Sequence, residues 1–369
     1  MKIGIDATSL SRKITGIENY TFNLCKTLLS FDKVNSYVIF FRKQIHHDLL
    51  SFQKTNKFLL SPYDNQIFCE QFWLPYIILK EKLDVVHFPA FPPGLFVYEK
   101  CIITLHDATM WKHPCTLSWK NKIYMKPLTI LALKKSEKII TVSESSKKDI
   151  ITYCNVGNNK IINTGESISE KFMIIEDKNK LNKVRLRYNL PDKYILAVSS
   201  IEPRKNIESI LQAYSILKSK NTIDYKLVLV GRKAWGSKNV QERVNDLKIN
   251  DDVVFTDYIG GEDLICVYNM ASLFVYPSFY EGFGLPPLEA MACGAPVLAS
   301  DIEVFKEVLG DAAILVSPTD VKAIANNIYI IMNNHILRNE LKEKGLERVK
   351  SLSWEDVAKK TIGIYESIC

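Results

Sequence analysis

Glu281 and Glu289 stand eight residues apart around the segment G-F-G-L-P-P-L, and each carboxylate could accept hydrogen bonds from hydroxyl groups. Gly282 and Gly284 allow a sharp turn before a proline pair that suits the first turn of a helix. Such a loop presents free backbone N–H groups at a helix N-terminus, where a phosphate can bind. A carboxylate inside that helix would repel the phosphate, so we expect Glu289 to face neighbouring hydroxyls, as on a ribose. Taken alone, either glutamate could equally be a surface charge.

Two cations form a second candidate group. Arg204 and Lys205 lie in the segment E-P-R-K-N, between a strand expected at 194–199 and a helix expected at 207–218. Exposed cations usually avoid a helix N-terminus, because the helix dipole is already positive there. Their position therefore indicates a site for an anion such as a diphosphate.

Other candidate residues lie at strand ends. His106 and Asp107 follow a strand expected at 101–105, so they lie at the carboxyl edge of a parallel sheet, where ligands collect. His106 could donate a hydrogen bond to a sugar hydroxyl or stabilise a developing charge, although a histidine that only caps a strand is an alternative. Gly16 lies between the first strand and the first helix, which suits a phosphate loop but is also ordinary turn chemistry.

These residues need a scaffold of alternating strands and helices, and the apolar pattern predicts one in each half of the chain. Such alternation is typical of doubly wound parallel sheets. We place a linker near 173–180, which predicts domains at 1–173 and 174–353 and a final helix at 354–369. The expected strands are 2–6, 37–41, 57–60, 85–88, 101–105 and 139–142, then 194–199, 226–230, 253–255, 273–276, 296–299 and 313–316.

Composition excludes several classes of protein. The chain has 369 residues, of which 47% are hydrophobic and 24% charged, as expected for a globular protein of two domains. Its eight cysteines include no C-x-x-C pair, so we expect reduced thiols in the cytoplasm and neither disulfides nor a zinc site. The first residues read as a strand and not a signal peptide, and no apolar run is as long as a membrane span. No G-x-G-x-x-G, P-loop or D-x-D motif is present, which argues against a dehydrogenase, an ATPase and a D-x-D metal site.

The net charge of +7 is unevenly distributed. Residues 1–173 hold 23 Lys and Arg against 15 Asp and Glu, whereas residues 174–369 hold 25 against 26. The excess suggests that the first half meets an anionic partner such as a phospholipid surface or a lipid diphosphate, and plain solubilising lysine is the alternative. The candidate residues lie in one helical stretch and are Trp119, Lys120, Lys122, Tyr124, Lys126, Lys134 and Lys135.

The motifs together resemble a known family. The paired glutamates around G-F-G-L-P-P-L, the E-P-R-K-N segment, T-L-H-D at 104–107 and T-G-I-E-N-Y-T-F-N-L at 15–24 resemble the retaining GT-B glycosyltransferases of family four, also called glycosyl transferases group 1. Bacterial O-antigen and capsule mannosyltransferases are especially similar. The resemblance runs from about residue 5 to 354. It implies two Rossmann-like domains facing across a cleft, with the acceptor bound by the first, the donor by the second, and the final helix packed on the first.

The resemblance also implies residue roles. Arg204 and Lys205 would hold the donor diphosphate, Glu281 the sugar hydroxyls and Glu289 the ribose. His106 would contact the donor sugar, and Asp107 would orient the imidazole or contact the acceptor. No metal or other cofactor is expected. Further donor contacts are expected at Gly16, Tyr258, Ile259, Gly282, Phe283, Gly284 and Leu285.

The expected reaction is transfer of a hexose, with mannose as the first candidate, from a nucleoside-diphosphate sugar to a glycan or lipid-linked acceptor. Lipopolysaccharide O-antigen or capsule assembly is the expected setting, in the cytoplasm or at the inner face of the cell membrane, and no nucleic-acid partner is expected. A nucleotide-sugar 2-epimerase with the same fold is one alternative, which would act on the donor alone. A non-catalytic scaffold is another, which predicts a degraded site.

Overall fold

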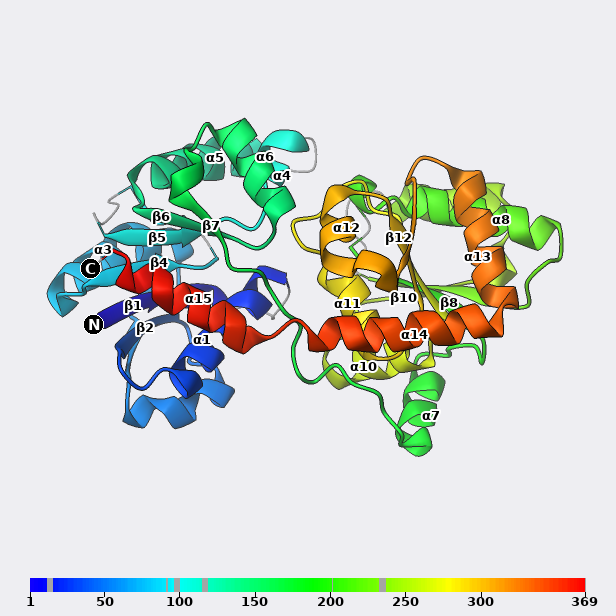
Figure 1. Ribbon diagram of the computed structural model, residues 1–369, viewed down its shortest axis with the longest axis horizontal. Helices are drawn as coiled ribbons and strands as arrows, with labels where there is room; N and C mark the ends of the chain where they lie inside the picture. Colours follow the sequence, from blue (N-terminus) through cyan, green and yellow to red (C-terminus); the bar gives the residue numbers. More distant parts are fainter. Residues whose placement is uncertain are drawn as a thin grey trace. The chain divides into compact units, whose positions relative to one another are not determined.

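The computed structural model describes the whole chain except residues 12–15, 91, 96–99, 115–118, 201, 232–236 and 369. The described chain forms two compact units (Figure 1). Unit 1 consists of Met1–Ser167 together with Ser353–Cys369, and unit 2 consists of Ile168–Leu352. Each unit is built on a parallel sheet with a core of its own. No helix in the described ranges is both long and apolar enough to cross a membrane.

Unit 1 contains a seven-stranded parallel sheet in the order β3-β2-β1-β4-β5-β6-β7. Most strand residues are buried, as expected for a sheet covered by helices on both faces. The short strand β7 is not among the strands expected from the sequence, because its I-I-N run is too brief to give a pattern. The strands are β1 (Lys2–Asp6), β2 (Ser36–Arg42), β3 (Lys57–Ser61), β4 (Val85–Phe88), β5 (Cys101–Thr104), β6 (Lys138–Thr141) and β7 (Ile161–Asn163).

The helices of unit 1 include one from the end of the chain. This helix, α15 (Trp354–Glu366), packs on the first helix and buries Trp354, Val357 and Tyr365. The Tyr365 hydroxyl lies 2.7 Å from Nδ1 of buried His87 on β4. The other helices are η1 (Thr8–Ser11), α1 (Gly16–Phe31), η2 (His47–Lys54), α2 (Gln66–Phe68), η3 (Cys69–Trp73), α3 (Leu74–Glu81), α4 (Thr109–Lys112), α5 (Trp119–Lys135), α6 (Glu144–Cys154) and η5 (Asn158–Lys160).

Unit 2 contains a six-stranded parallel sheet in the order β10-β9-β8-β11-β12-β13. Its strands are β8 (Tyr194–Val198), β9 (Lys226–Val230), β10 (Val253–Thr256), β11 (Leu273–Tyr276), β12 (Val297–Ser300) and β13 (Ile314–Val316). Its helices are α7 (Lys178–Arg187), η6 (Pro203–Lys205), α8 (Ile207–Ser219), α9 (Ser237–Asp246), η7 (Asn250–Asp252), α10 (Gly261–Met270), α11 (Leu285–Ala292), α12 (Glu303–Leu309), η8 (Gly310–Ala312), α13 (Val321–Asn333) and α14 (His335–Lys350).

The chain enters unit 2 earlier than the linker expected near 173–180. Phe172 packs edge-on against Tyr268 of α10, with the ring centroids 6.0 Å apart. Asn269 donates from Nδ2 to the Met173 carbonyl at 2.9 Å and accepts the Ile175 N–H at 2.7 Å. These contacts fix the segment before α7 on unit 2. The charged residues from 178 onward are therefore a helix and not a linker.

Candidate functional site

The loop between β11 and α11 carries Glu281 and has the geometry expected from the sequence. Gly284 has a φ of +100°, and a Cβ there would lie 2.4 Å from Cε1 of Phe305. Only glycine fits this position, because a side chain would be both strained and obstructed. The two prolines occupy the first turn of α11, and Gly294 ends the helix with a φ of +80°. Glu281 is thereby held on a rigid turn next to a helix N-terminus.

Arg204 and Lys205 lie in η6, between β8 and α8, as predicted. The following residue, Asn206, is in the left-handed conformation with a φ of 57°. Its amide donates to the carbonyls of Pro277 at 2.9 Å and Pro318 at 2.7 Å. Asn206 therefore ties the loop that carries the cations to the loop that follows β11. Local sequence patterns do not reveal this link, because the carbonyls that Asn206 contacts lie 71 and 112 residues away along the chain.

The two cations contact Glu281 directly. Lys205 donates from Nζ to Oε1 of Glu281 at 2.7 Å, and Arg204 donates from Nη1 to Oε2 at 3.0 Å. The Ser278 hydroxyl donates to the same Oε1 at 2.7 Å. Lys205 also donates to the Tyr276 hydroxyl at 2.8 Å. Sequence reasoning assigned the glutamate and the cations separate tasks and missed Tyr276 and Ser278, whereas the structure joins them in one buried network.

Charge pairing governs the protonation of this network. Burial alone would raise the pKa of Glu281, but Lys205 and Arg204 outweigh it and lower that pKa to about 2. Burial lowers the pKa of Lys205, and the Glu281 carboxylate opposes this shift. Arg204 also pairs with a second carboxylate, because its Nη2 lies 3.8 Å from Oε2 of Glu202. The two cations lie at the N-terminus of α8, whose positive dipole end favours an anion.

Glu289 has a different environment from Glu281. It lies in α11, half-buried, and its Oε2 accepts a hydrogen bond from the Tyr268 hydroxyl of α10 at 2.9 Å. Burial raises the pKa of Glu289 to about 7, although the bond from Tyr268 acts in the opposite direction. The carboxylate therefore changes charge near neutral pH. Tyr268 carries no motif that sequence reasoning could have used.

The remaining residues expected to contact a donor differ in accessibility. Phe283 is buried between Gly282 and Gly284, and Leu285 begins α11. Tyr258, which follows β10, has an exposed ring with 41% of its surface accessible. Ile259 is only 2% exposed, so it packs in the interior.

In unit 1, His106 and Asp107 follow β5 as predicted. His106 donates from Nε2 to the Pro89 carbonyl at 3.0 Å, and its ring meets Tyr20 edge-on, with the centroids 4.7 Å apart. Burial lowers the pKa of His106, so the neutral imidazole is favoured. Asp107 accepts the Thr109 N–H on Oδ1 at 2.8 Å, in the turn that leads into α4.

Gly16 begins α1, one residue before the start of the helix expected from the sequence. A Cβ at this position would have no neighbour within 4 Å among the described atoms. Steric packing in the described part of unit 1 therefore does not require glycine here. The preceding loop residues 12–15 lie outside the described ranges.

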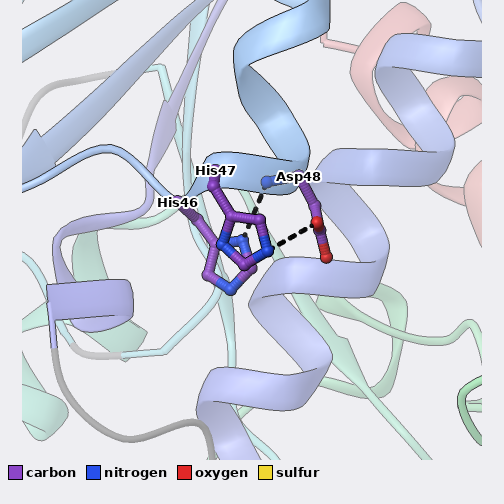
Figure 2. A group of neighbouring side chains, drawn as sticks. All are labelled: His46, His47 and Asp48. Carbon is purple, nitrogen blue, oxygen red and sulfur yellow. Dashed lines mark hydrogen bonds and ion pairs between the residues drawn. The ribbon is translucent and has the colours of Figure 1, made fainter.

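Across the described ranges, one group of three side chains has the composition of a metal site. It consists of His46, His47 and Asp48 at the start of η2, with ligand atoms within 4.8 Å of one another (Figure 2). His46 accepts the Asp48 N–H on Nδ1 at 3.3 Å and caps the helix, while His47 Nε2 lies 2.9 Å from Oδ1 of Asp48. These contacts account for the arrangement as a helix cap. The group belongs to unit 1, whereas the network around Glu281 belongs to unit 2.

Comparisons with known proteins identify the family. The model described as "Glycosyltransferase Family 4" matches residues 14–163, and "Glycosyl transferases group 1" matches residues 178–348. The chain is 31% identical to O-antigen chain mannosyltransferase B of Escherichia coli, over 99% of this chain and 100% of that relative. Sucrose-phosphate synthase of Thermosynechococcus elongatus has a TM-score of 0.77 at 20% identity, covering 100% of this chain and 98% of that one. HepE of Anabaena, in complex with UDP and glucose, has a TM-score of 0.71 at 14% identity, covering 100% of both chains.

The structural likeness confirms the GT-B fold class, with a seven-stranded and a six-stranded parallel sheet in its two units. The sequence likeness extends over both units, and its two family models cover both sets of motifs. The chain therefore belongs to the family four glycosyltransferases, the glycosyl transferases group 1, and is a transferase enzyme.

Proposed function

We propose that the chain transfers a hexosyl group, with mannose as the first candidate, from a nucleoside-diphosphate sugar to a glycan or lipid-linked acceptor, with retention of configuration. The observation that carries the proposal is the network in which buried Lys205 and partly buried Arg204 both contact the Glu281 carboxylate at a helix N-terminus. Mannose is supported by the name of the Escherichia coli relative, and a nucleotide donor by the UDP in the HepE structure.

The cations would act on the leaving group. Negative charge develops on the departing diphosphate, and Arg204, Lys205 and the backbone N–H groups near Gly284 would stabilise it. Glu281 already receives hydrogen bonds from Lys205, Arg204 and Ser278. Because a carboxylate accepts about four such bonds, Glu281 can hold both cations in place and still accept one from a sugar hydroxyl.

The other candidate residues would bind the rest of the substrates. Glu289 would accept hydrogen bonds from the ribose hydroxyls, while Tyr258 and the backbone of Ile259 would border the base. We propose that His106 contacts the transferred sugar and that Asp107 orients the imidazole or contacts the acceptor. Gly16 would belong to a loop that approaches the diphosphate, and no metal or cofactor is assigned to the reaction.

Assembly of a surface polysaccharide, such as an O-antigen or capsule, is the proposed setting. It is supported by the O-antigen relative and by the excess of basic residues in the first half of the chain. A lipid-linked acceptor would bring the enzyme to the cytoplasmic face of a membrane, where anionic lipids attract basic segments. We therefore include peripheral contact with an anionic membrane in the proposal.

A panel of GDP, UDP and dTDP in a thermal-shift assay identifies the base, because binding to the native state alone raises the midpoint. Transfer is then measured with the matching sugar donor and a soluble acceptor. Arg204→Ala and Lys205→Ala should each lower the transfer rate by roughly two to three orders of magnitude. Lys220→Ala, an exposed cation at the other end of α8, is the matched control. A double Arg204→Ala, Lys205→Ala variant with near-native turnover, or an epimer formed from the donor alone, would contradict the proposal.

A further inference from the structure

Tyr268 and Glu289 form a pair that joins helix α10 to helix α11. The Tyr268 hydroxyl donates to Oε2 of Glu289 at 2.9 Å, and the tyrosine side chain is fully buried. Phe172 and Phe274 both meet the Tyr268 ring edge-on, with ring centroids 6.0 and 5.6 Å away. The phenol is therefore held by packing as well as by its hydrogen bond, and its hydroxyl stays directed at the carboxylate.

The same ring connects Glu289 to the network around Glu281. Phe274 and Tyr276 are alternate residues of β11, so they lie on one face of the strand, and their rings stack with centroids 5.7 Å apart. Lys205 donates to the Tyr276 hydroxyl at 2.8 Å and to Oε1 of Glu281 at 2.7 Å. A continuous row of aromatic rings thus runs from the hydrogen bond on one glutamate to the cation that binds the other.

The groups around Glu289 are neutral. The titratable side chains that face it are Tyr268 on α10, Tyr276 on β11 and Cys293, which follows α11. Burial raises the pKa of Cys293 to about 12 and the pKa values of both tyrosines well above their usual range, so all three keep their protons at pH 7. Helix α14 brings Lys342 to the turn that ends α11, where it is exposed. Within the described ranges, no ion pair joins Glu289 to a cation.

We infer that Tyr268 is a positioning residue for Glu289, because it holds one carboxylate oxygen so that the other can meet the ribose hydroxyls of the donor. This inference rests on the proposed function and deepens it. Glu289 is half-buried, and its Oε1 accepts no hydrogen bond from a described side chain, so that oxygen can accept from a ligand. A phenol suits this task because it orients the carboxylate without neutralising it, and a hydrogen bond to the ionised form favours that form.

Recognition of the ribose should therefore depend on pH. Burial raises the pKa of Glu289 to about 7, and the hydrogen bond from Tyr268 opposes this rise. The ionised carboxylate accepts hydrogen bonds from two neighbouring hydroxyls, whereas the protonated acid has lost part of that capacity. Affinity for a ribose-containing ligand should accordingly rise with pH through about 7 and then level off. Loss of the tyrosine hydroxyl should move the midpoint of this rise to higher pH.

The test measures dissociation constants of the full chain by calorimetry between pH 5.5 and 8.5. The probes are whichever of GDP, UDP and dTDP binds most tightly, and its 2′,3′-dideoxy form, which keeps the base and the diphosphate but lacks the sugar hydroxyls. In Tyr268→Phe the first probe should bind roughly three- to tenfold more weakly at pH 7.5, and within about twofold of the wild type at pH 5.5. The dideoxy probe should bind within about twofold of the wild type throughout. The matched control is Tyr188→Phe, which removes a hydroxyl that donates to Asp263 of the same helix α10 at 2.8 Å and should change neither affinity.

A double-mutant cycle shows whether Tyr268 acts through the carboxylate. In a Glu289→Gln background, Tyr268→Phe should cause no further loss of affinity. Equal losses for the two probes, a loss that is the same at every pH, or a further loss in the Glu289→Gln background would overturn the inference and leave Tyr268 a structural role alone. Because each variant is compared with itself on two probes, a modest loss of stability does not disturb the comparison. A wild type that binds both probes equally refutes the ribose contact and the inference with it, whereas failure to bind any of the three diphosphates refutes the proposed function.

Discussion

Replacing Glu281 by glutamine tests how much the buried network stabilises unit 2. The carboxylate is 8% exposed and its pKa is about 2 in the folded chain, against an ordinary value of 4.5. Lys205 and Arg204 lower this pKa against the opposing effect of burial. The difference corresponds to about 3 kcal/mol of stability at neutral pH. Because the folded-state pKa is depressed, this contribution is complete above about pH 5 and is lost as the pH falls towards 2.

Glu281→Gln should therefore lower the free energy of opening of unit 2 by about 3 kcal/mol at pH 7, and by about half as much at pH 3. Native-state hydrogen exchange of peptides from β8 and β11 measures this free energy, with peptides from β1 and β5 in unit 1 as internal controls. Glu262→Gln, which breaks an exposed ion pair with Lys180, should have little effect. The reasoning would be refuted if both variants lowered the free energy of opening equally, or if the decrease in Glu281→Gln did not depend on pH.

The structure supports three further predictions. Glu289→Gln should stabilise unit 2 increasingly from about pH 5 to pH 7 and by a constant amount above, because the folded state raises the pKa of this carboxyl from 4.5 to about 7; exchange measured at pH 4 and pH 8 checks the dependence. Gly284→Ala should lower the free energy of unfolding by about 1–3 kcal/mol, because the backbone there is strained for any other residue. Gly363→Ala, inside α15 with open space around it, should raise the free energy of unfolding by about 0.5–1 kcal/mol. Thermal denaturation measures both changes. Tyr365→Phe should lower the stability of unit 1 by about 1–3 kcal/mol, because it removes the hydrogen bond to Nδ1 of buried His87 while the bond from Nε2 to Thr104 remains; hydrogen exchange of β4 should report the loss.

Short stretches of sequence predicted most strands and helices, and they also predicted which strand end or loop carries each candidate site residue. The strand before the glycine loop, the proline turn and the closing Gly294 follow from short-range backbone preferences, and all three are confirmed. The same holds for the turn that carries Arg204 and Lys205. These features are encoded within a few residues of where they occur, so a single sequence is enough to predict them.

Contacts between distant segments could not be predicted in the same way. Lys205 and Glu281 are 76 residues apart, and Tyr268 and Glu289 are 21 apart on different helices. Spacing along the chain does not say which pairs meet, because this depends on strand order and on how far each loop rises above the sheet. Composition was also misleading near residue 178, where charges typical of a linker lie on a helix tied to α10 by pairs such as Lys180–Glu262.

The return of α15 to unit 1 determines the order in which the two units can be completed during synthesis. Unit 2 is one continuous segment, so all its residues have emerged once Leu352 has left the ribosome. Unit 1 must wait for the residues that follow, because Trp354 packs on Tyr20 with ring centroids 5.6 Å apart and Tyr365 meets His87. The earlier-made part of unit 1 thus keeps an apolar surface uncovered while unit 2 is synthesised, a state in which chaperones commonly act. A released chain truncated after Leu352 would contain all of unit 2 joined to a unit 1 that lacks α15.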